Sequence, residues 1–238
     1  MNYMDFSSDQ INIFMILVDC SGSMEKDEDK VREGLKLYKK SFENFPEADS
    51  IAVSISRFSS SFYPSEFRNV KDLDTGYRAD GATALYYSIV KGAEYLIEYV
   101  QEVTEKTGVV PRVTYIVKSD GEPCEDEYNT PAGRKMARDI IENLNYAGVT
   151  TVFIAFGNAI TSEFGKELGF MSTIDVVDRK TLVNFLGVEL SQSCKEQSKS
   201  LKALGANFFS KAVGDTQSES YSQTAKQALE DTSWIDDI

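Results

Sequence analysis

The chain has 238 residues, of which 42% are hydrophobic and 26% are charged, a balance typical of a folded globular protein rather than a disordered or fibrous one. Lys and Arg number 25 against 38 Asp and Glu, so the formal net charge is −13. This acidic balance excludes general nucleic-acid binding and disfavours anionic membrane surfaces, because both need clustered basic side chains. We therefore expect neither a nucleic acid nor a membrane as a partner.

The sequence contains no histidine, which removes several enzyme classes. Ser-His-Asp and Cys-His catalysis and zinc binding by an HExxH motif are excluded. The three cysteines, Cys20, Cys124 and Cys194, are widely spaced and form no CxxC pair, so we interpret them as free thiols in a reducing compartment. The first basic residue is Lys26, and the apolar run 13–18 is too short to span a bilayer. A cytoplasmic protein is therefore expected.

Short apolar segments predict the strands of a sheet. The first, 11–18, is nearly continuous apolar sequence, as in a parallel strand that is covered on both faces. The strands expected after it are 51–56, 113–117, 151–156 and 174–177, with a hairpin or short edge strand within 59–70.

Apolar residues at spacings of three and four predict amphipathic helices between these strands. The expected helices are 31–45, 85–108, 136–148, 161–168 and 182–190. The third of them carries its apolar stripe at Met136, Ile140 and Leu144. Strands that alternate with helices predict an α/β fold, a Rossmann-like, doubly wound, mostly parallel central sheet flanked by helices.

The composition changes near residue 200. Residues 210–233 are rich in Ser, Gln and Thr with little periodicity, and 201–238 hold three Lys and six Asp or Glu, a net charge of 3 − 6 = −3. We expect a folded domain over 8–200 and a disordered acidic tail over 201–238. The alternative is that Trp234 and Ile235 anchor a docking segment on this domain or on a partner.

Three motifs carry oxygen-bearing side chains. Asp19, Ser21 and Ser23 follow the first expected strand in a D-x-S-x-S spacing, and such a tight loop offers hard oxygen atoms to one point, as Mg²⁺ requires. Thr83 opens the second helix within the sequence GATAL, and Asp120 follows a later strand within Ser-Asp-Gly. Because the carboxyl ends of parallel strands meet at one edge of a sheet, we expect all of these residues to lie there.

Together the motifs resemble the von Willebrand factor A domain and its metal-ion-dependent adhesion site. The resemblance implies that Asp19, Ser21 and Ser23 hold the ion directly or through water. It further implies that Thr83 coordinates in the ligand-engaged arrangement and that Asp120 acts through water. Another protein then supplies an Asp or Glu to the remaining position. Mg²⁺ is the expected ion, with Mn²⁺ and Ca²⁺ as alternatives.

The resemblance favours a metal-dependent protein-binding module and not an enzyme. The chain looks like the stand-alone cytosolic members of bacteria, which implies a role in intracellular complex assembly or stress response. One alternative is a Mg²⁺-dependent phosphatase-like enzyme, because aspartyl phosphatases keep their nucleophile at the end of a first strand. Those enzymes look like D-x-D, whereas Ser21 stands at the second acidic position here and the general acid is missing. A purely structural assembly protein, in which the ion staples loops, is the other alternative.

Two acidic runs flank the expected site: Glu25, Asp27, Glu28 and Asp29 after the first motif, and Glu122, Glu125, Asp126 and Glu127 after the third. They are either an ordinary solvated face or a field that raises cation occupancy and repels an acidic ligand. In the second case the partner offers its carboxylate amid basic residues, or the rim holds a second, weaker ion. Cys20 and Cys124 also lie beside the expected ion, as small loop residues or as an oxidation-sensitive pair.

Overall fold

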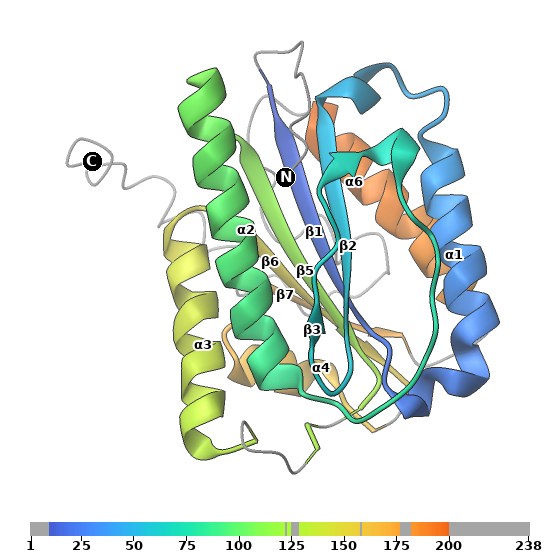
Figure 1. The fold of residues 1–238 in the computed structure, drawn as a ribbon, viewed down its shortest axis with the longest axis vertical. Coiled ribbons are helices and arrows are strands. Elements are labelled where there is room, and N and C mark those ends of the chain that lie inside the picture. Colours follow the sequence, from blue (N-terminus) through green and yellow to red (C-terminus); the bar gives the residue numbers. More distant parts are fainter. Residues whose placement is uncertain (1–9, 122, 125–128, 158, 177–181, 200–238) are drawn as a thin grey trace.

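A computed structural model describes residues 10–121, 123–124, 129–157, 159–176 and 182–199. It confirms the expected α/β architecture, a central sheet with helices on both faces (Figure 1). Within these residues no helix combines the length and the apolar character that a membrane span requires. The expected tail over 201–238, with Trp234 and Ile235, lies outside the described residues, as do Glu122, Glu125, Asp126 and Glu127.

The sheet has the strand order β3-β2-β1-β5-β6-β7, with β4 paired to β2. Its parallel strands are β1 (Asn12–Asp19), β2 (Ile51–Phe58), β5 (Arg112–Ser119), β6 (Thr150–Phe156) and β7 (Ser172–Val176). Two short strands, β3 (Phe62–Tyr63) and β4 (Arg68–Asn69), run antiparallel to β2. They confirm the edge strand that the sequence predicts within 59–70.

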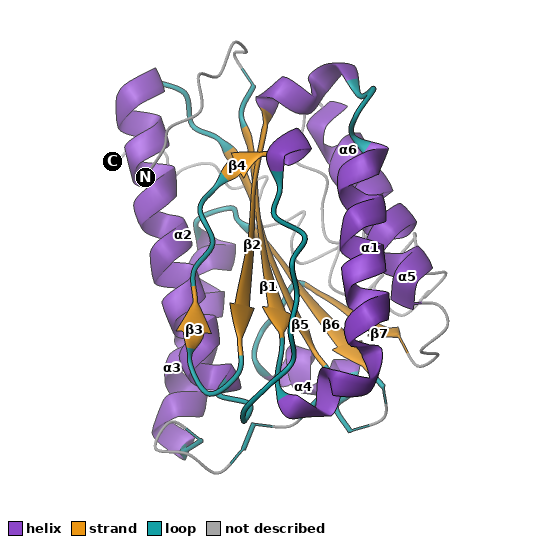
Figure 2. Ribbon diagram, turned by 45° about the vertical axis from the view of Figure 1, so that its right-hand side comes forward, coloured by secondary structure: helices purple, strands orange, loops and turns teal. Residues whose placement is uncertain are grey.

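Strand β1 lies between two parallel neighbours, and all of its residues are buried. Its register pairs Asp19 with Phe58 of β2 and Val18 with Lys118 of β5. The arrowheads of the parallel strands therefore point to one edge of the sheet, which we call the carboxyl edge (Figure 2). This edge is where ligands bind in sheets of this kind.

Helices cover both faces of the sheet (Figures 1 and 2). One layer contains α2 (Leu85–Thr107), α3 (Pro131–Tyr146) and α4 (Ser162–Glu167). The other contains α1 (Glu28–Ser41), α5 (Leu182–Asn184), the π-helical turn η4 (Phe185–Glu189) and α6 (Leu190–Lys199). Short 3₁₀ helices are η1 (Gly22–Asp27), η2 (Pro46–Ser50) and η3 (Val70–Asp72).

The side chains of β1 divide between two apolar cores. Phe14, Ile16 and Val18 pack in the core under α1, whereas the alternate residues Ile13, Met15 and Leu17 pack in the core under α2. Both faces of the strand are covered, which explains why its sequence is almost uninterrupted apolar residues.

Two sequence expectations about helices are wrong in detail. Met136 is 58% exposed, because α3 turns Ala137, Ile141 and Leu144 toward the core instead of the stripe that begins one residue earlier. The first helix ends at Ser41 rather than near residue 45. The aromatic residues that follow it are still buried, but they lie in the turn before η2, where Pro46 stops a continued helix.

Candidate metal centre

Asp19 is the last residue of β1 and is fully buried. Its Oδ1 accepts the backbone N–H of Ser21 at 2.9 Å, and its Oδ2 accepts the hydroxyl of Ser119 at 2.5 Å. One hydrogen bond to each oxygen fixes the orientation of the carboxylate and leaves a lone pair on each atom for another ligand. The local fold thus holds this carboxylate ready for a cation.

The first and third motifs are joined by hydroxyl contacts. Ser21 Oγ lies 3.0 Å from Ser23 Oγ, and Ser23 Oγ donates to Oδ1 of Asp120 at 2.8 Å. Ser21 and Asp120 are buried, whereas Ser23 is exposed. A continuous chain of oxygen atoms therefore runs from the interior to the surface at the carboxyl edge.

The second motif reaches the same place. Thr83 is buried and lies two residues before α2, whose N-cap is Ala84. A Cβ atom at Gly121 would lie 3.7 Å from Thr83 Oγ1 and 3.9 Å from Ser23 Oγ, so both hydroxyls face the Ser-Asp-Gly turn. The structure thus gathers all of the sequence-predicted ligand residues at one corner of the molecule.

The electrostatics of this corner fit a divalent cation. Burial, followed by the nearby charge of Asp19, raises the pKa of Asp120, while Lys118 and the hydrogen bond from Ser23 oppose the shift. Two carboxylates confined in this way gain from a cation that neutralises both. Within the described part of the chain, no three Asp, Glu, His or Cys side chains form a cluster able to hold a metal, so the candidate site here depends on hydroxyl oxygens beside its two carboxylates. Two carboxylates and three hydroxyls form an all-oxygen donor set, which suits Mg²⁺, Mn²⁺ or Ca²⁺.

Lys118 is a member of the site that the sequence reasoning missed. It is fully buried in β5, with Nζ 3.2 Å from Met24 Sδ and 4.7 Å from the centre of the Phe156 ring. Burial lowers the pKa of its ammonium to about 8, against the opposing charges of Asp19 and Asp120. A lysine inside an otherwise buried strand, directly before Ser-Asp-Gly, is the signal that could have revealed it.

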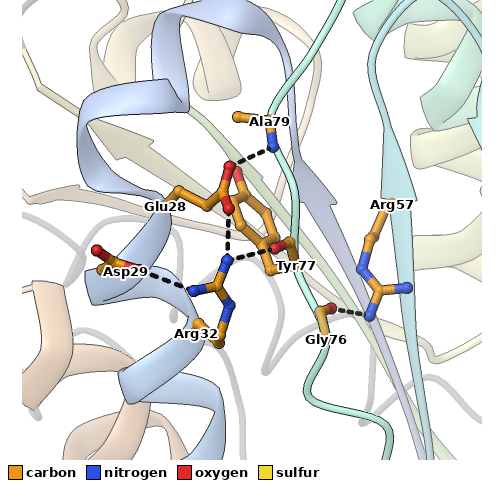
Figure 3. A network of polar contacts seen from close by, with 7 residues as sticks. All are labelled: Glu28, Asp29, Arg32, Arg57, Gly76, Tyr77 and Ala79. Atoms are coloured by element: carbon orange, nitrogen blue, oxygen red, sulfur yellow. Dashed lines mark hydrogen bonds and ion pairs between the residues drawn. The ribbon is translucent and has the colours of Figure 1, made fainter.

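A loop that we call the strap, residues 73–81, is fixed to α1 and β2 (Figure 3). From α1, Arg32 donates to the carbonyl of Tyr77 at 3.0 Å, and Glu28 accepts the backbone N–H of Ala79 at 3.1 Å while pairing with Arg32. From β2, Arg57 donates to the carbonyl of Gly76. The strap is therefore held from both sides by charged side chains.

The inner side of the strap shapes the metal loop, residues 19–23. The Tyr77 hydroxyl donates to the carbonyl of Asp19 at 2.5 Å, and the N–H of Asp80 donates to the carbonyl of Cys20 at 2.8 Å. Gly22 donates to the carbonyl of Gly81 at 2.9 Å. Gly81 has a φ of +84°, and a Cβ there would lie 2.7 Å from Ser60 Oγ, so this junction requires glycine.

The first acidic run divides between the fold and the solvent, with Asp27 and Glu28 engaged in contacts and Glu25 and Asp29 exposed. Asp27 is fully buried and pairs with Lys30 at 3.0 Å. Asp29 pairs with Arg32 at 2.8 Å, on the same guanidinium that Glu28 contacts. Glu25 and Asp29 are exposed carboxylates, and Glu25 lies next to the metal loop.

The two cysteines near the site differ in environment. Cys20 is buried, and burial together with the charge of Asp19 raises the pKa of its thiol to about 11, whereas Cys124 is exposed. Because the thiolate is the reactive form, Cys20 is protonated and inert at neutral pH. This environment favours the interpretation of Cys20 as a small loop residue over that of an oxidation-sensitive pair.

No protein-family model matches the sequence, and the curated proteins hold no match to it. Solved structures do match. The pilus adhesin SpaC of Lactobacillus rhamnosus GG, in its open conformation, superposes with a TM-score of 0.61 and 14% identity over 79% of this chain and 30% of that one. The ArnB paralog VWA2 of Sulfolobus acidocaldarius gives 0.51 and 20% identity over 75% of this chain and 44% of that one.

A third neighbour is the proximal thread matrix protein 1 of the mussel byssus, solved with a zinc-occupied metal-ion-dependent adhesion site motif. It gives a TM-score of 0.53 and 16% identity over 78% of this chain and 48% of that one. These similarities show that the chain has the von Willebrand factor A fold, as its motifs indicate. The chain spans less than half the length of each of these three structures.

Proposed function

We propose that this protein is a metal-dependent binding module whose ion grips an acidic side chain of a partner protein. The observation that carries the proposal is the convergence of three sequence motifs on two buried carboxylates at the carboxyl edge. Asp19, Ser21 and Ser23 would hold the ion, with Thr83 and Asp120 completing the protein's share of the ligands. When bound, the ion supplies a Lewis acid that accepts a carboxylate oxygen.

Three of the proposed ligand residues have distinct roles in this proposal. Asp19 is buried and oriented by two hydrogen bonds, so it supplies fixed negative charge. Ser23 is exposed and already bonded to Asp120, so it links the interior ligands to the surface that a partner meets. Thr83 faces the same turn from the start of α2 and can present its hydroxyl there.

Mg²⁺ is the proposed ion because the donors are hard oxygens and Mg²⁺ prefers such ligands together with several waters. The mussel protein with its zinc-occupied motif supports a divalent cation at this position of the fold. The three cysteines, all free, support a reducing, intracellular compartment as part of the same proposal, with a role in complex assembly or stress response.

Binding of manganese provides a direct test, because Mn²⁺ also takes oxygen ligands and is paramagnetic. The enhancement of water-proton relaxation by the Mn²⁺ complex reports the waters on the ion. We expect the wild type to bind one Mn²⁺ and acetate, a stand-in for the partner's carboxylate, to lower the enhancement by displacing a water. Asp19→Ala should bind no Mn²⁺, while Asp72→Ala, an exposed carboxylate in η3, should behave as the wild type.

The same samples separate the alternatives. If Mn²⁺ binds and acetate leaves the relaxation unchanged, the ion has no open position and the structural role is favoured. Hydrolysis of p-nitrophenyl phosphate that disappears in Asp19→Ala would instead establish a phosphatase. The proposal expects no such activity, since Ser21 stands where aspartyl phosphatases need a general acid.

A further inference from the structure

An open groove of about 490 Å³ adjoins the metal loop. The residues that line it come from the end of β2, from β3 and from the strap, and they include Arg57, Tyr63, Tyr77 and Arg78. Cys20, which stands between the proposed ligands Asp19 and Ser21, also lines it. The groove therefore begins at the proposed metal site, but the side chains that line it are not the proposed metal ligands.

Arg57 brings unused hydrogen-bond donors to this groove. Its side chain is 21% exposed, and one Nη atom donates to the carbonyl of Gly76. Its Nε is buried and has no acceptor within the described part of the chain. Because a guanidinium has five N–H groups, some remain for an incoming acceptor although Nε is buried and one Nη is engaged.

Arg78 adds a second guanidinium. Its side chain is exposed and forms no hydrogen bond or ion pair with the residues that the structure describes. Its backbone is nevertheless fixed, because the preceding Tyr77 is bonded to Arg32 through its carbonyl and to Asp19 through its hydroxyl. A free guanidinium on a fixed backbone is suited to bidentate binding of a carboxylate.

The groove also contains two carboxylates, and they are not equivalent. Asp74 accepts the backbone N–H of Gly76 at 2.8 Å and lies 3.7 Å from Arg57, so its charge is already partly compensated. Asp80 is exposed and forms no ion pair with the described residues. Asp80 should therefore repel an acidic ligand while the arginines attract it.

We propose that this groove is a second anchoring site for the partner, in which Arg57 and Arg78 bind an acidic side chain of the segment whose other carboxylate reaches the metal. The inference rests on the proposed function, and it names the partner class as an extended protein segment with two acidic residues. The metal supplies the first anchor and the arginines the second. Asp80, whose backbone N–H donates to the carbonyl of Cys20, lowers the affinity of the two arginines for this acidic side chain by charge repulsion.

Blocked synthetic peptides provide the probe. Each carries an Asp for the metal and a Glu, separated by glycine spacers of increasing length, and each has a matched partner in which the Glu is replaced by Gln. Binding is followed in Mg²⁺ by ¹H–¹⁵N correlation spectra, which include the buried Nε–H of Arg57. At one spacing we expect the two-acid peptide to bind about tenfold more tightly than its Gln partner and to shift the Arg57 Nε–H signal.

Variants assign this gain to the groove. Arg78→Gln should reduce the advantage of the two-acid peptide by roughly fivefold, and Asp80→Asn should increase the affinity of that peptide by roughly threefold. The matched control is Arg68→Gln in β4, which makes the same charge change on an exposed arginine outside the groove. It should leave the advantage unchanged. Single-acid peptides should bind Arg78→Gln as they bind the wild type.

The outcomes separate the two proposals. Equal affinities for the two-acid peptides and their Gln partners at every spacing overturn the groove and leave the metal function standing. An advantage that Arg68→Gln reduces as much as Arg78→Gln also overturns it, since a general charge effect is then at work. If no peptide binds in Mg²⁺, or binding persists in EDTA with the same affinity, the proposed metal function is the one that fails.

Discussion

Two aspartates near the carboxyl edge show how differently the fold uses the same side chain. Asp175 in β7 is exposed, and both of its oxygens are engaged by Ser162, which donates its N–H at 2.7 Å and its hydroxyl at 2.6 Å. Asp19 in β1 is fully buried, and its charge reaches a second carboxylate, Asp120. The first arrangement ties α4 to the sheet, whereas the second places two carboxylates beside each other, and a bound cation would relieve their repulsion.

The largest expected effect is a difference between the two aspartates. Asp19→Asn should weaken Mg²⁺ binding by at least about 100-fold, because it removes the negative charge of a proposed ligand, whereas the loss of an outer-shell partner alone costs about 10–100-fold. Asp175→Asn should leave Mg²⁺ affinity unchanged and lower stability by about 1 kcal/mol, since a charge-assisted hydrogen bond is weakened. Isothermal titration calorimetry and chemical denaturation measure the two quantities. Equal effects of the two substitutions on metal affinity would remove the distinction.

A second test alters the charge that already faces Asp19. Lys118→Met should raise Mg²⁺ affinity by roughly tenfold, because a buried ammonium near the carboxylates repels the incoming ion. Calorimetry in low-salt buffer measures the change. Lys30→Met, which removes a partly exposed lysine paired with Asp27, is the matched control and should change the affinity less. Weaker binding in Lys118→Met would show that the lysine positions the ligands instead of competing with the ion.

A third test concerns the strap. Tyr77→Phe removes the hydroxyl that donates to the carbonyl of Asp19, so the metal loop loses one of its fixed contacts. We expect Mg²⁺ affinity to fall by roughly fivefold with little loss of burial, because the ring itself is kept. Tyr99→Phe, at a buried tyrosine of α2 outside the strap, should leave metal affinity unchanged. An unchanged affinity in Tyr77→Phe would mean that the metal loop keeps its shape without the strap.

The smallest expected effect is on the stability of the metal-free protein. The pKa of Asp120 is raised in the folded state, so the folded protein keeps the proton on this carboxyl to higher pH than the unfolded chain does. The free energy of unfolding therefore falls as pH rises from the pKa of the unfolded chain through that of the folded protein. Asp120→Asn lacks this charge, so in EDTA at neutral pH it should melt about 2–4 °C higher than the wild type, which corresponds to about 1 kcal/mol.

Thermal unfolding in EDTA across a pH series checks this expectation. The advantage of Asp120→Asn should vanish below the ordinary aspartate range, where the wild-type carboxyl is protonated in both states. Added Mg²⁺ should reverse the order, because it stabilises the wild type more than the variant. A variant that melts lower than the wild type in EDTA at every pH contradicts this account.

The sequence predicts the strands, the parallel sheet and the positions of the candidate-site residues, because each leaves a local signal. The D-x-S-x-S loop, Thr83 and Asp120 each occur at the end of an apolar segment or the start of a helix. Parallel winding alone then brings them together. The strand 11–18 is recognisable for the same reason, since burial on both faces leaves an uninterrupted apolar run.

What the sequence does not reveal depends on contacts between distant segments. The strap lies in 73–81, which has no periodic pattern, and its contacts with Glu28 and Arg57 exist only in the folded molecule. Lys118 appears as one charged residue at a strand end until its complete burial is known. The stripe predicted for α3 is wrong at its start, because residues beginning at Met136 and at Ala137 both follow helical spacing and share Leu144, and only tertiary packing selects between them.

The metal loop grows out of β1, a central strand of the sheet, and this has a consequence for the lifetime of the protein. An ion bound there would stabilise the folded protein, because a ligand specific to the folded state shifts the unfolding equilibrium by mass action. Chelation should therefore raise the fraction of unfolded molecules that proteases can cut. Resistance to digestion would then track the supply of free divalent cation, and molecules that have lost their ion would be removed first.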